Sequence, residues 1–310
     1  MAETMATRQA YGKTLIELGE KYPQLVVMDA DLSKSTMTAE FGKTYPDRFF
    51  NMGIAEQNLY GAAAGLALSG KIVCASTFAM FATGRAFEII RNSIGYTRAN
   101  VKICATHAGI TVGEDGASHQ TFEDIALMRT IPGMTVINPS DGVSAKKLLE
   151  QAVAMEGPCY VRLGRAKVPV FYEDFDQLTL GKGNLVRDGK DVTIVATGIM
   201  VSEAMAAAEK LKKDGIDARI IDIHTIKPID EEILIKAAQE TGAIVTAEEH
   251  SIIGGLGSAV AEVIVKNCPV KMAMVGQKDT YGESGKPDEL KKKYGMTAED
   301  IEVAVKNLIG

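Results

Sequence analysis

Short, continuous apolar segments alternate with helical patterns along the first half of the chain. The apolar runs lie at 25–29, 72–76, 101–106, 135–137 and 160–163, and the helical patterns at 7–21, 83–96, 121–130 and 141–155. Strands that are apolar at consecutive positions and separated by helices are typical of a parallel sheet that is buried on both faces. The pattern therefore predicts an α/β fold with a helix-covered, mostly parallel sheet.

A second alternation follows a break in the pattern. Residues 168–190 hold a proline, acidic residues and glycines without a sustained period, which is typical of a linker. Beyond it, strand-like runs at 192–196, 218–223, 243–247 and 272–275 alternate with helical patterns at 202–214, from about 230, at 256–266 and near the C-terminus. A chain of 310 residues has room for two cores. We expect one α/β domain at 1–168, a linker at 169–190 and a smaller α/β domain at 191–310.

Ligands of a parallel sheet bind beside the carboxyl ends of its strands. Most of the unusual polar residues of the first half lie in the loops that follow those ends, at 29–35, 77–81, 107–119 and 164–167. Two of the four histidines, His107 and His119, share one of these loops with Asp115. A lone histidine is usually structural, but two with a carboxylate in a glycine-rich loop indicate a candidate site.

Two arginines accompany these loops. Arg8 opens the first helical pattern and Arg165 follows the run at 160–163, and each alone is typical of a protein surface. Together with His107 and Ser35 they offer the charge-assisted hydrogen bonds that hold a phosphate monoester.

The segment 51–60 places a glutamate at a strand-to-helix corner. Gly53 stands three residues before Glu56, so the pattern predicts that Gly53 caps a helix and that Glu56 lies in its first turn, where a carboxylate complements the helix dipole. The small residues of 61–70 would let another helix come close.

Three of the nine phenylalanines, Phe78, Phe81 and Phe87, cluster in one loop-to-helix segment. Core packing is the default role for such residues. Stacking on a flat heterocycle is the alternative.

Composition and missing motifs exclude several classes of protein. A net charge of -6 without a basic stripe argues against nucleic-acid binding. The four scattered cysteines form no CxxC pair, so buried reduced thiols are expected. No signal-peptide core and no membrane-spanning apolar run are present, which predicts a cytoplasmic protein without a membrane partner. The glycine-rich segment 109–116 lacks the Gly-Lys-Ser/Thr of a P-loop, and the segment 254–260 matches a dinucleotide fingerprint only loosely.

Several motifs, in order, resemble the transketolase family. The resemblance to its pyrimidine-binding domain rests on Gly53-Ile-Ala-Glu-Gln57, Thr77-Phe-Ala-Met-Phe81, Thr106-His107, Val112-Gly-Glu-Asp-Gly116 with His119, and Asn138-Pro-Ser-Asp-Gly142. The resemblance to its C-terminal domain rests on Asp222-Ile-His-Thr-Ile-Lys-Pro228 and Asp279-Thr-Tyr-Gly-Glu-Ser-Gly-Lys-Pro287. The resemblance covers nearly the whole chain and implies transfer of a two-carbon ketol unit between sugar phosphates of the pentose phosphate pathway.

The resemblance implies a thiamine diphosphate site. Glu56 would hydrogen-bond the aminopyrimidine ring nitrogen and so drive deprotonation of the thiazolium. Phe81, supported by Phe78, would stack on the pyrimidine, and Asp31 would lie near the thiazolium.

The resemblance also implies a sugar site. Asp115 would contact a sugar hydroxyl, and His119 would contact the reacting carbonyl region. Glu56, His107 and His119 are the expected catalytic residues. The residues expected to hold the sugar phosphate are Arg8, Ser35, His107 and Arg165.

The family's Gly-Asp-Gly…Asn segment, which holds the diphosphate and a divalent metal, is absent from this sequence. We therefore expect the C-terminal subunit of a split transketolase. Its partner would be a separate N-terminal chain that holds Mg²⁺ or Ca²⁺, and the two would form an α2β2 assembly. Two departures from the family pattern are Asn58, where many relatives have histidine, and a segment after Phe81 that is one residue longer than in some relatives.

Three alternatives remain open. Deoxyxylulose-phosphate synthase shares the Gly-Ile-Ala-Glu-Gln segment, although the His107, Asp115 and His119 loop favours transketolase. The β subunit of a 2-oxoacid dehydrogenase E1 has the same two domains but no use for a phosphate-holding set. A non-enzymatic regulatory or structural remnant is the third, and the retained Glu56, His107 and His119 argue against it.

Overall fold

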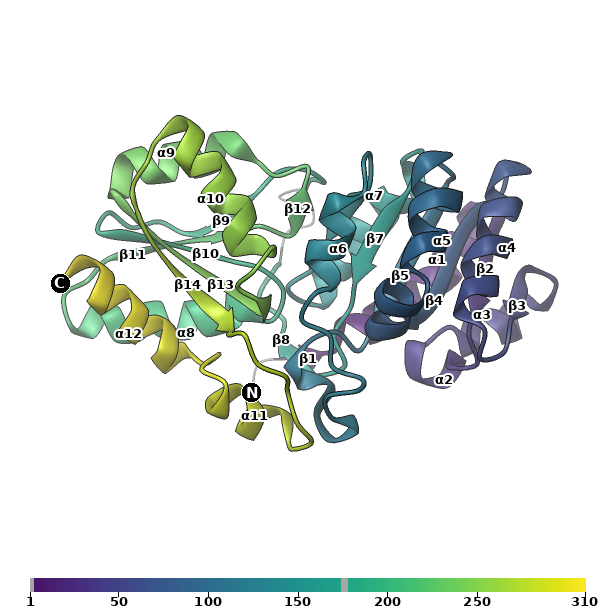
Figure 1. The fold of residues 1–310 in the computed structure, drawn as a ribbon, viewed down its shortest axis with the longest axis horizontal. Coiled ribbons are helices and arrows are strands. Elements are labelled where there is room, and N and C mark those ends of the chain that lie inside the picture. The colour runs from purple at the N-terminus through teal and green to yellow at the C-terminus, as the bar shows by residue number, and fades with distance from the viewer. Residues whose placement is uncertain (1–2, 174–177) are drawn as a thin grey trace.

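The chain folds into two parallel-dominated sheets, each covered by helices, which stand side by side in Figure 1. This computed structural model describes residues 3–173 and 178–310. Residues 1 and 2 of the predicted first domain and 174–177 of the predicted linker lie outside the described residues. The predicted α/β fold is confirmed.

Within the described part of the chain, the first sheet has seven strands in the order β12-β6-β7-β5-β4-β2-β3. Six of them run parallel, and β12 is antiparallel to its neighbour β6. All residues of β2, β4 and β5 are buried, as expected for strands covered on both faces. The strands are β2 (Leu25–Asp29), β3 (Phe49–Asn51), β4 (Ile72–Phe78), β5 (Val101–Thr106), β6 (Thr135–Ile137), β7 (Cys159–Arg162) and β12 (Thr225–Lys227).

Helices cover this sheet and connect its strands. The α-helices are α1 (Thr7–Lys21), α2 (Ser33–Thr36), α3 (Ala39–Thr44), α4 (Glu56–Leu68), α5 (Phe87–Ile89), α6 (Asp124–Thr130) and α7 (Gly142–Ala154). The 3₁₀ helices are η1 (Pro46–Arg48) and η4 (Ile110–Asp115), and the π-helical segments are η2 (Phe81–Arg85) and η3 (Ile90–Tyr96).

The helix predicted at 83–96 departs from a regular α-helix. Two π-helical segments, η2 and η3, flank the three residues of α5. A π-turn accommodates one more residue than an α-turn. The segment after Phe81, which was expected to be one residue longer than in some relatives, lies within η2.

The second sheet has five strands, counted over the described residues, in the order β14-β13-β10-β11-β9. Its strands are β9 (Asn184–Arg187), β10 (Val192–Ala196), β11 (Ala218–Asp222), β13 (Ala243–Ser251) and β14 (Lys271–Gln277). Its helices are α8 (Met200–Lys213), α9 (Glu231–Thr241), α10 (Leu256–Asn267), α11 (Pro287–Lys293) and α12 (Ala298–Ile309).

Sequence reasoning missed three strand pairings. β9 lies inside the range predicted as a linker, 169–190, yet it pairs antiparallel with β11, so residues 184–187 belong to the second sheet. β12 comes from the second half of the chain and completes the edge of the first sheet. β1 (Thr4–Met5) and β8 (Val168–Pro169) form a short antiparallel pair. Each of these edge strands is too short to give a periodic signal.

The cysteines are free, as expected, with Cys74, Cys104 and Cys159 buried and Cys268 half-buried. In the described ranges, no helix combines the length and the apolar character needed to cross a membrane.

Candidate active site

The candidate site lies at the carboxyl edge of the seven-stranded sheet. Parallel strands end at the same edge, so the loops after β2, β3, β4, β5 and β7 lie close to one another. Phe78 ends β4, His107 follows β5 directly, and Arg165 lies three residues beyond β7. The edge thus collects side chains that are distant in the sequence.

Glu56 is the first residue of α4, and its side chain is only 3% exposed. The prediction that it lies in the first helical turn is confirmed. The prediction that Gly53 caps the helix is wrong: Ala55 is the N-cap, without a side-chain hydrogen bond, and Gly53 instead turns the chain with φ of 70°. The carboxylate accepts a hydrogen bond from Arg85, with Nη1 3.5 Å from Oε2.

An asparagine joins the loops after β2 and β3. Asn51 Nδ2 donates to Asp31 Oδ1 at 3.1 Å, and Asn51 Oδ1 accepts from the amides of Asp31 and Gly53, both at 3.0 Å. Asp31 has φ of 63°, a conformation that aspartate tolerates better than most residues. These bonds fix Asp31 to the turn that leads into Glu56.

Four rings form a continuous aromatic row. The rings of Phe78 and His107 stack with centroids 3.9 Å apart, and Phe81 lies parallel to Phe78 at 6.1 Å. His119 meets Phe81 edge-on at 5.3 Å, and the Arg85 guanidinium lies 5.4 Å from the Phe81 centroid. Arg85 therefore connects this row to Glu56. Phe87, by contrast, packs against the hydrophobic core.

His107 is held as a neutral imidazole. Its Nδ1 lies 2.9 Å from Thr106 Oγ1, and its Nε2 lies 3.5 Å from Arg8 Nη1. Burial, and then the positive charges of Arg8 and Arg165, lower the pKa of His107 to about 3. A neutral ring keeps one donor nitrogen and one acceptor nitrogen. At neutral pH it can therefore offer a hydrogen bond to a ligand without adding charge.

Arg8 connects the row to α2. Its Nη1 donates to the backbone oxygen of Ser35 at 2.6 Å. Burial, and then the nearby Arg165, lower the pKa of Arg8. Its Nε is buried and has no hydrogen-bond partner among the described residues. Such a donor is suited to an anion that enters the site.

Arg165 already has an acidic partner. Its Nη1 donates to Glu114 Oε2 at 2.8 Å and to the backbone oxygen of Val112 at 2.7 Å. The Arg165 side chain is 36% exposed, and Asp115, which ends η4, is exposed. An anion would therefore compete with Glu114 for Arg165.

The structure brings most of the predicted residues together. An unbroken series of contacts runs from Glu56 through Arg85, Phe81, Phe78 and His107 to Arg8 and the Ser35 backbone. His119 lies edge-on to Phe81 at the end of the aromatic row. Asp31 stands beside the series at Asn51, and Asp115 lies on the exposed loop before His119.

Sequence reasoning missed Arg85, Asn51 and Thr106. Arg85 gives no clear signal of its own in the sequence. Asn51 and Thr106 stand directly at strand ends, which is the signal that could have found them.

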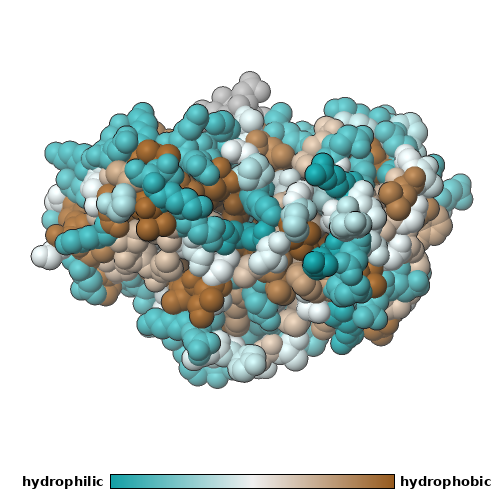
Figure 2. Space-filling model, turned by 45° about the horizontal axis from the view of Figure 1, so that its top comes forward, coloured by the Kyte–Doolittle hydropathy of each residue, from teal (hydrophilic) through white to brown (hydrophobic). Residues whose placement is uncertain are grey.

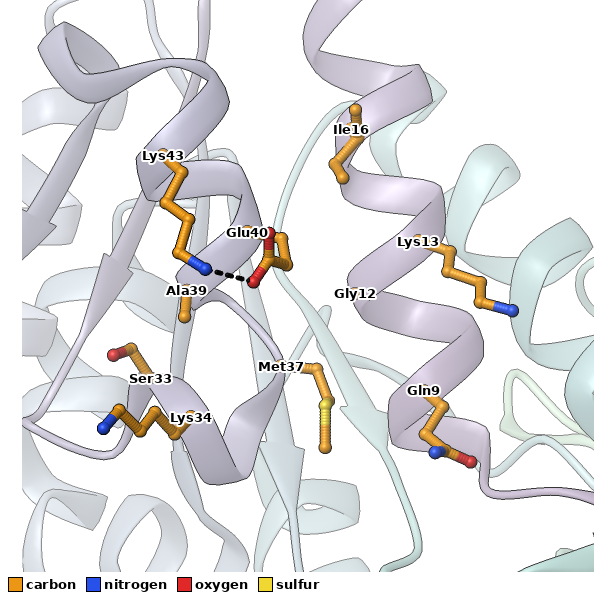
Figure 3. A pocket seen from close by; sticks show the side chains of 10 residues that line it. All are labelled: Gln9, Gly12, Lys13, Ile16, Ser33, Lys34, Met37, Ala39, Glu40 and Lys43. Carbon is orange, nitrogen blue, oxygen red and sulfur yellow. Dashed lines mark hydrogen bonds and ion pairs between the residues drawn. The ribbon is translucent and has the colours of Figure 1, made fainter.

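A pocket of about 490 Å³ lies beside the site, between α1 and the α2–α3 region (Figure 3). It borders the site through Ser33 and Lys34 of α2, but its described lining contains none of the predicted site residues. Over residues 3–173 and 178–310, no group of three or more His, Cys, Asp or Glu residues is placed to hold a metal ion.

Comparison with known proteins gives matches over most of the chain. The pyrimidine binding domain of transketolase matches residues 3–170, and the C-terminal domain of transketolase matches residues 181–301. The chain is 57% identical to a "Putative transketolase C-terminal section" of Methanocaldococcus jannaschii, covering 95% of this chain and 93% of that protein. It is 44% identical to a 6-deoxy-6-sulfo-D-fructose transketolase subunit of Clostridium sp. (strain MSTE9), covering 95% and 91%. The solved structure of a "Split gene transketolase, inactive beta4 tetramer" is similar with a TM-score of 0.92 and 55% identity, over 98% of both chains.

Proposed function

The chain belongs to the transketolase family, and we propose that it is the C-terminal subunit of a split, thiamine-diphosphate-dependent transketolase. With a separate N-terminal subunit, it transfers a two-carbon ketol unit between anionic ketose and aldose substrates. The observation that carries the proposal is the series of contacts from Glu56 to Arg8. Along one edge lie a buried carboxylate, an aromatic row and Arg8, whose Nε has no hydrogen-bond partner among the described residues.

The residues present fit the pyrimidine end of thiamine diphosphate. Glu56 is a buried carboxylate that pairs with Arg85, its one cationic partner in the described part of the chain, and the partly exposed ring of Phe81 lies next to that cation. A buried acceptor beside an aromatic face matches a flat, hydrogen-bonding heterocycle. When bound, the cofactor supplies an acidic thiazolium carbon that reacts with the ketose carbonyl. Glu56 would hold the pyrimidine ring nitrogen, Phe81 and Phe78 would support the ring, and Asp31 would lie near the thiazolium.

The other end of the row fits the sugar. Arg8, Ser35, His107 and Arg165 would hold the anionic group, and Asp115 and His119 would contact the hydroxyl and carbonyl region. We propose that the anion is a phosphate or a sulfonate; a relative named as a 6-deoxy-6-sulfo-D-fructose transketolase subunit supports including the sulfonate. Both present oxygens to which guanidinium groups donate.

The surface around α4 supports a partner chain. Phe50, Ile54 and Leu68 are 43%, 78% and 64% exposed. A Cβ built on Gly65 of α4 would meet nothing within 4 Å. Exposed apolar side chains beside a helix with small residues would allow another chain to pack closely against this surface. The proposed partner holds the diphosphate and Mg²⁺ or Ca²⁺ in an α2β2 assembly in the cytoplasm, with residues 1–168 of this chain as its pyrimidine-binding domain and 191–310 as its C-terminal domain.

The test is reconstitution with the N-terminal subunit. We expect the pair to convert xylulose 5-phosphate and ribose 5-phosphate in the presence of thiamine diphosphate and Mg²⁺, and this chain alone to convert neither. A matched reaction with pyruvate and glyceraldehyde 3-phosphate serves as the control. Activity with pyruvate only would contradict the proposal and favour a deoxyxylulose-phosphate synthase. A sulfonated ketose in place of the phosphate separates the two anions.

A further inference from the structure

The loop that carries Asp115 and His119 packs against the second half of the chain at three glycines. A Cβ on Gly109 would collide with the Glu249 carboxyl, and one on Gly116 with the Ser284 hydroxyl. A Cβ on Gly113 would approach Pro287 to 3.2 Å. Each of these glycines has φ between 75° and 82°. The glycines therefore serve close approach to the second half as well as the turns of the loop.

The segment 281–284 of the second half packs as closely against the loop as the loop's glycines pack against the second half. A Cβ on Gly282 would collide with Gln120 Oε1. Gln120 Nε2 donates to the backbone oxygen of Glu283 at 2.9 Å and lies 3.4 Å from the backbone oxygens of Ile110 and Gly113. One buried amide thus ties the loop to itself and to the 281–284 segment.

Glu249 is the charged member of this contact. Its Oε1 accepts from the Thr111 amide at 2.7 Å, and the residue is 3% exposed. Arg162 holds it from the other side, with Nη2 2.8 Å from the Glu249 backbone oxygen and Nη1 4.0 Å from Oε2. Asp124 in turn fixes Arg162 at 2.7 Å. Arg162 and Asp124 therefore hold the Glu249 carboxylate in place independently of its bond to the loop.

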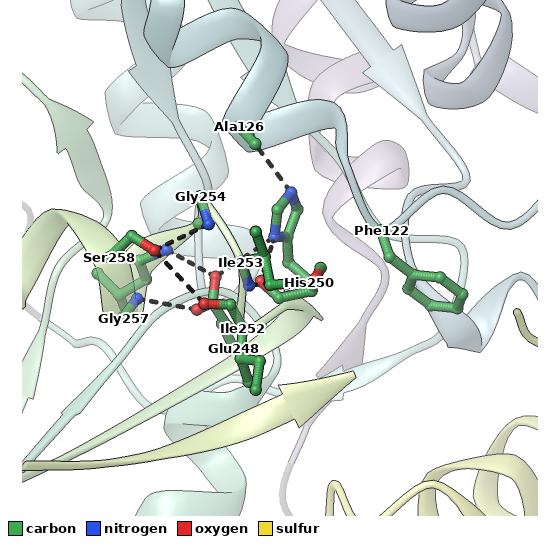
Figure 4. Close-up of polar contacts among 12 residues, drawn as sticks. Phe122, Ala126, Glu248, His250, Ile252, Ile253, Gly254, Gly257 and Ser258 are labelled. Carbon is green, nitrogen blue, oxygen red and sulfur yellow. Dashed lines mark hydrogen bonds and ion pairs between the residues drawn. The ribbon is translucent and has the colours of Figure 1, made fainter. Parts of the chain in front are cut away.

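Neighbouring side chains of β13 point to other elements. Glu248 accepts from the amides of Leu256 and Gly257 at the start of α10, at 2.6 and 2.8 Å (Figure 4). His250 Nε2 accepts from the Ala126 amide of α6 at 3.4 Å. Of these three consecutive residues, Glu249 is the one that bonds the loop.

We propose that Glu249 is a positioning residue for the loop of residues 109–120, and that the second half of the chain holds Asp115 and His119 in place against the sugar. The inference rests on the proposed function for the sugar, but the contact itself belongs to this chain. His119 lies at the end of the aromatic row, edge-on to Phe81. A loop free to move would carry His119 away from that ring.

The test compares Glu249→Ala with Glu249→Gln and with the control Glu248→Gln. Alanine removes the acceptor of the Thr111 amide, whereas glutamine keeps an oxygen for it. Glu248→Gln changes an equally buried carboxyl on the same strand that bonds α10. The readouts are amide hydrogen exchange at residues 110–119 of the full chain, and the KM for the aldose acceptor in the reconstituted enzyme.

Glu249→Ala should speed exchange in the loop about ten-fold and raise the acceptor KM by a similar factor, since a hydrogen bond to a buried charged group is lost. The kcat should fall less than the KM rises, and Glu249→Gln should restore most of the effect. Wild-type exchange in a folded Glu249→Ala, or equal loosening in Glu248→Gln, would overturn the inference.

A second variant covers the case in which Glu249→Ala does not fold. Gly282→Ala, at a half-buried position, should push Gln120 from the Glu283 oxygen and loosen the same amides; unchanged exchange there would overturn the inference. If the wild-type pair transfers no ketol unit, the proposed function fails. Hydrogen exchange on the chain still decides whether Glu249 holds the loop.

Discussion

Glu56 and His107 are both buried beside an arginine, with opposite consequences. The guanidinium of Arg85, whose side chain is 56% exposed, donates to the buried Glu56 carboxylate and so gives that carboxylate a positive partner. Arg8 opposes a charge on His107, which burial already disfavours, so the imidazole stays neutral. The two ends of the row are therefore electrostatically different: one presents a carboxylate, and the other presents neutral and cationic donors.

The neutral His107 has a consequence for stability at acid pH. Its pKa is about 3 in the folded chain and about 6.5 when unfolded. The unfolded state therefore binds the proton first, and stability falls as the pH drops below the unfolded pKa and stops falling below the folded pKa. Between pH 7.5 and 5.5 this one group lowers the free energy of unfolding by about 1.4 kcal/mol.

Urea denaturation at these two pH values checks that prediction. The variant His107→Asn, whose asparagine tolerates the φ of 58°, should lose about 1.4 kcal/mol less than wild type between pH 7.5 and 5.5. His224 and His250 also have pKa values lowered to about 4, but they are present in both chains and cancel. An equal loss in the two chains would contradict the neutral assignment.

At the scale of elements, the helix after β4 is the least regular part of the site. A 3.6-residue period predicts a helix there, and it correctly leaves Phe78 and Phe81 near its start. A 3.6-residue period cannot predict the π-turn η2, because a π-turn holds one more residue per turn than that period allows. Sequence reasoning missed Arg85 for this reason. In an α-helical register, Arg85 would not lie beside Glu56 and Phe81 as it does in η2.

Deletion of Gly84 tests the role of this π-turn. Gly84 is exposed, and removing it should convert η2 to an α-turn while leaving the downstream register unchanged. Arg85 would then lose its place beside Glu56 and Phe81. We expect a folded chain whose partner complex binds thiamine diphosphate about ten-fold more weakly, a loss of about 1.4 kcal/mol.

The matched control is Gly84→Ala. Its Cβ would meet only the flexible end of Met80, so the π-turn and the affinity should persist. Equal affinities for the deletion and the control would mean that η2 has no part in the site. Fluorescence titration of the reconstituted pair measures both.

At the scale of the whole molecule, the second half of the chain supplies a strand to the first sheet and a hydrogen bond to its 109–120 loop. Continuous apolar strands predict both sheets and the edge where the site lies, and the loops at this edge include Phe81 and His107. Glu56 was expected beside them only because of the family resemblance. Sequence reasoning did not place β12, because three residues before a proline have no strand period, yet β12 closes the first sheet from the second half. The contact of Glu249 with Thr111 spans 138 positions and leaves no local signal.

The distribution of apolar residues on the surface is also a feature of the whole chain. Figure 2 shows hydrophilic residues over much of one face, with hydrophobic patches between them. The exposed Phe50 and Ile54 flank the turn into Glu56. Apolar residues exposed beside a buried carboxylate are what the proposal of a site shared with a second chain expects.

Calorimetric titration of thiamine diphosphate, with Mg²⁺ present, tests this central claim most directly. The chain alone should bind little cofactor, and the reconstituted pair should bind it clearly. The same pair with Glu56→Ala should assemble but bind more weakly and transfer no ketol unit. Tight binding by the isolated chain, or near-normal turnover of the Glu56→Ala pair, would contradict the account of a site that two chains share.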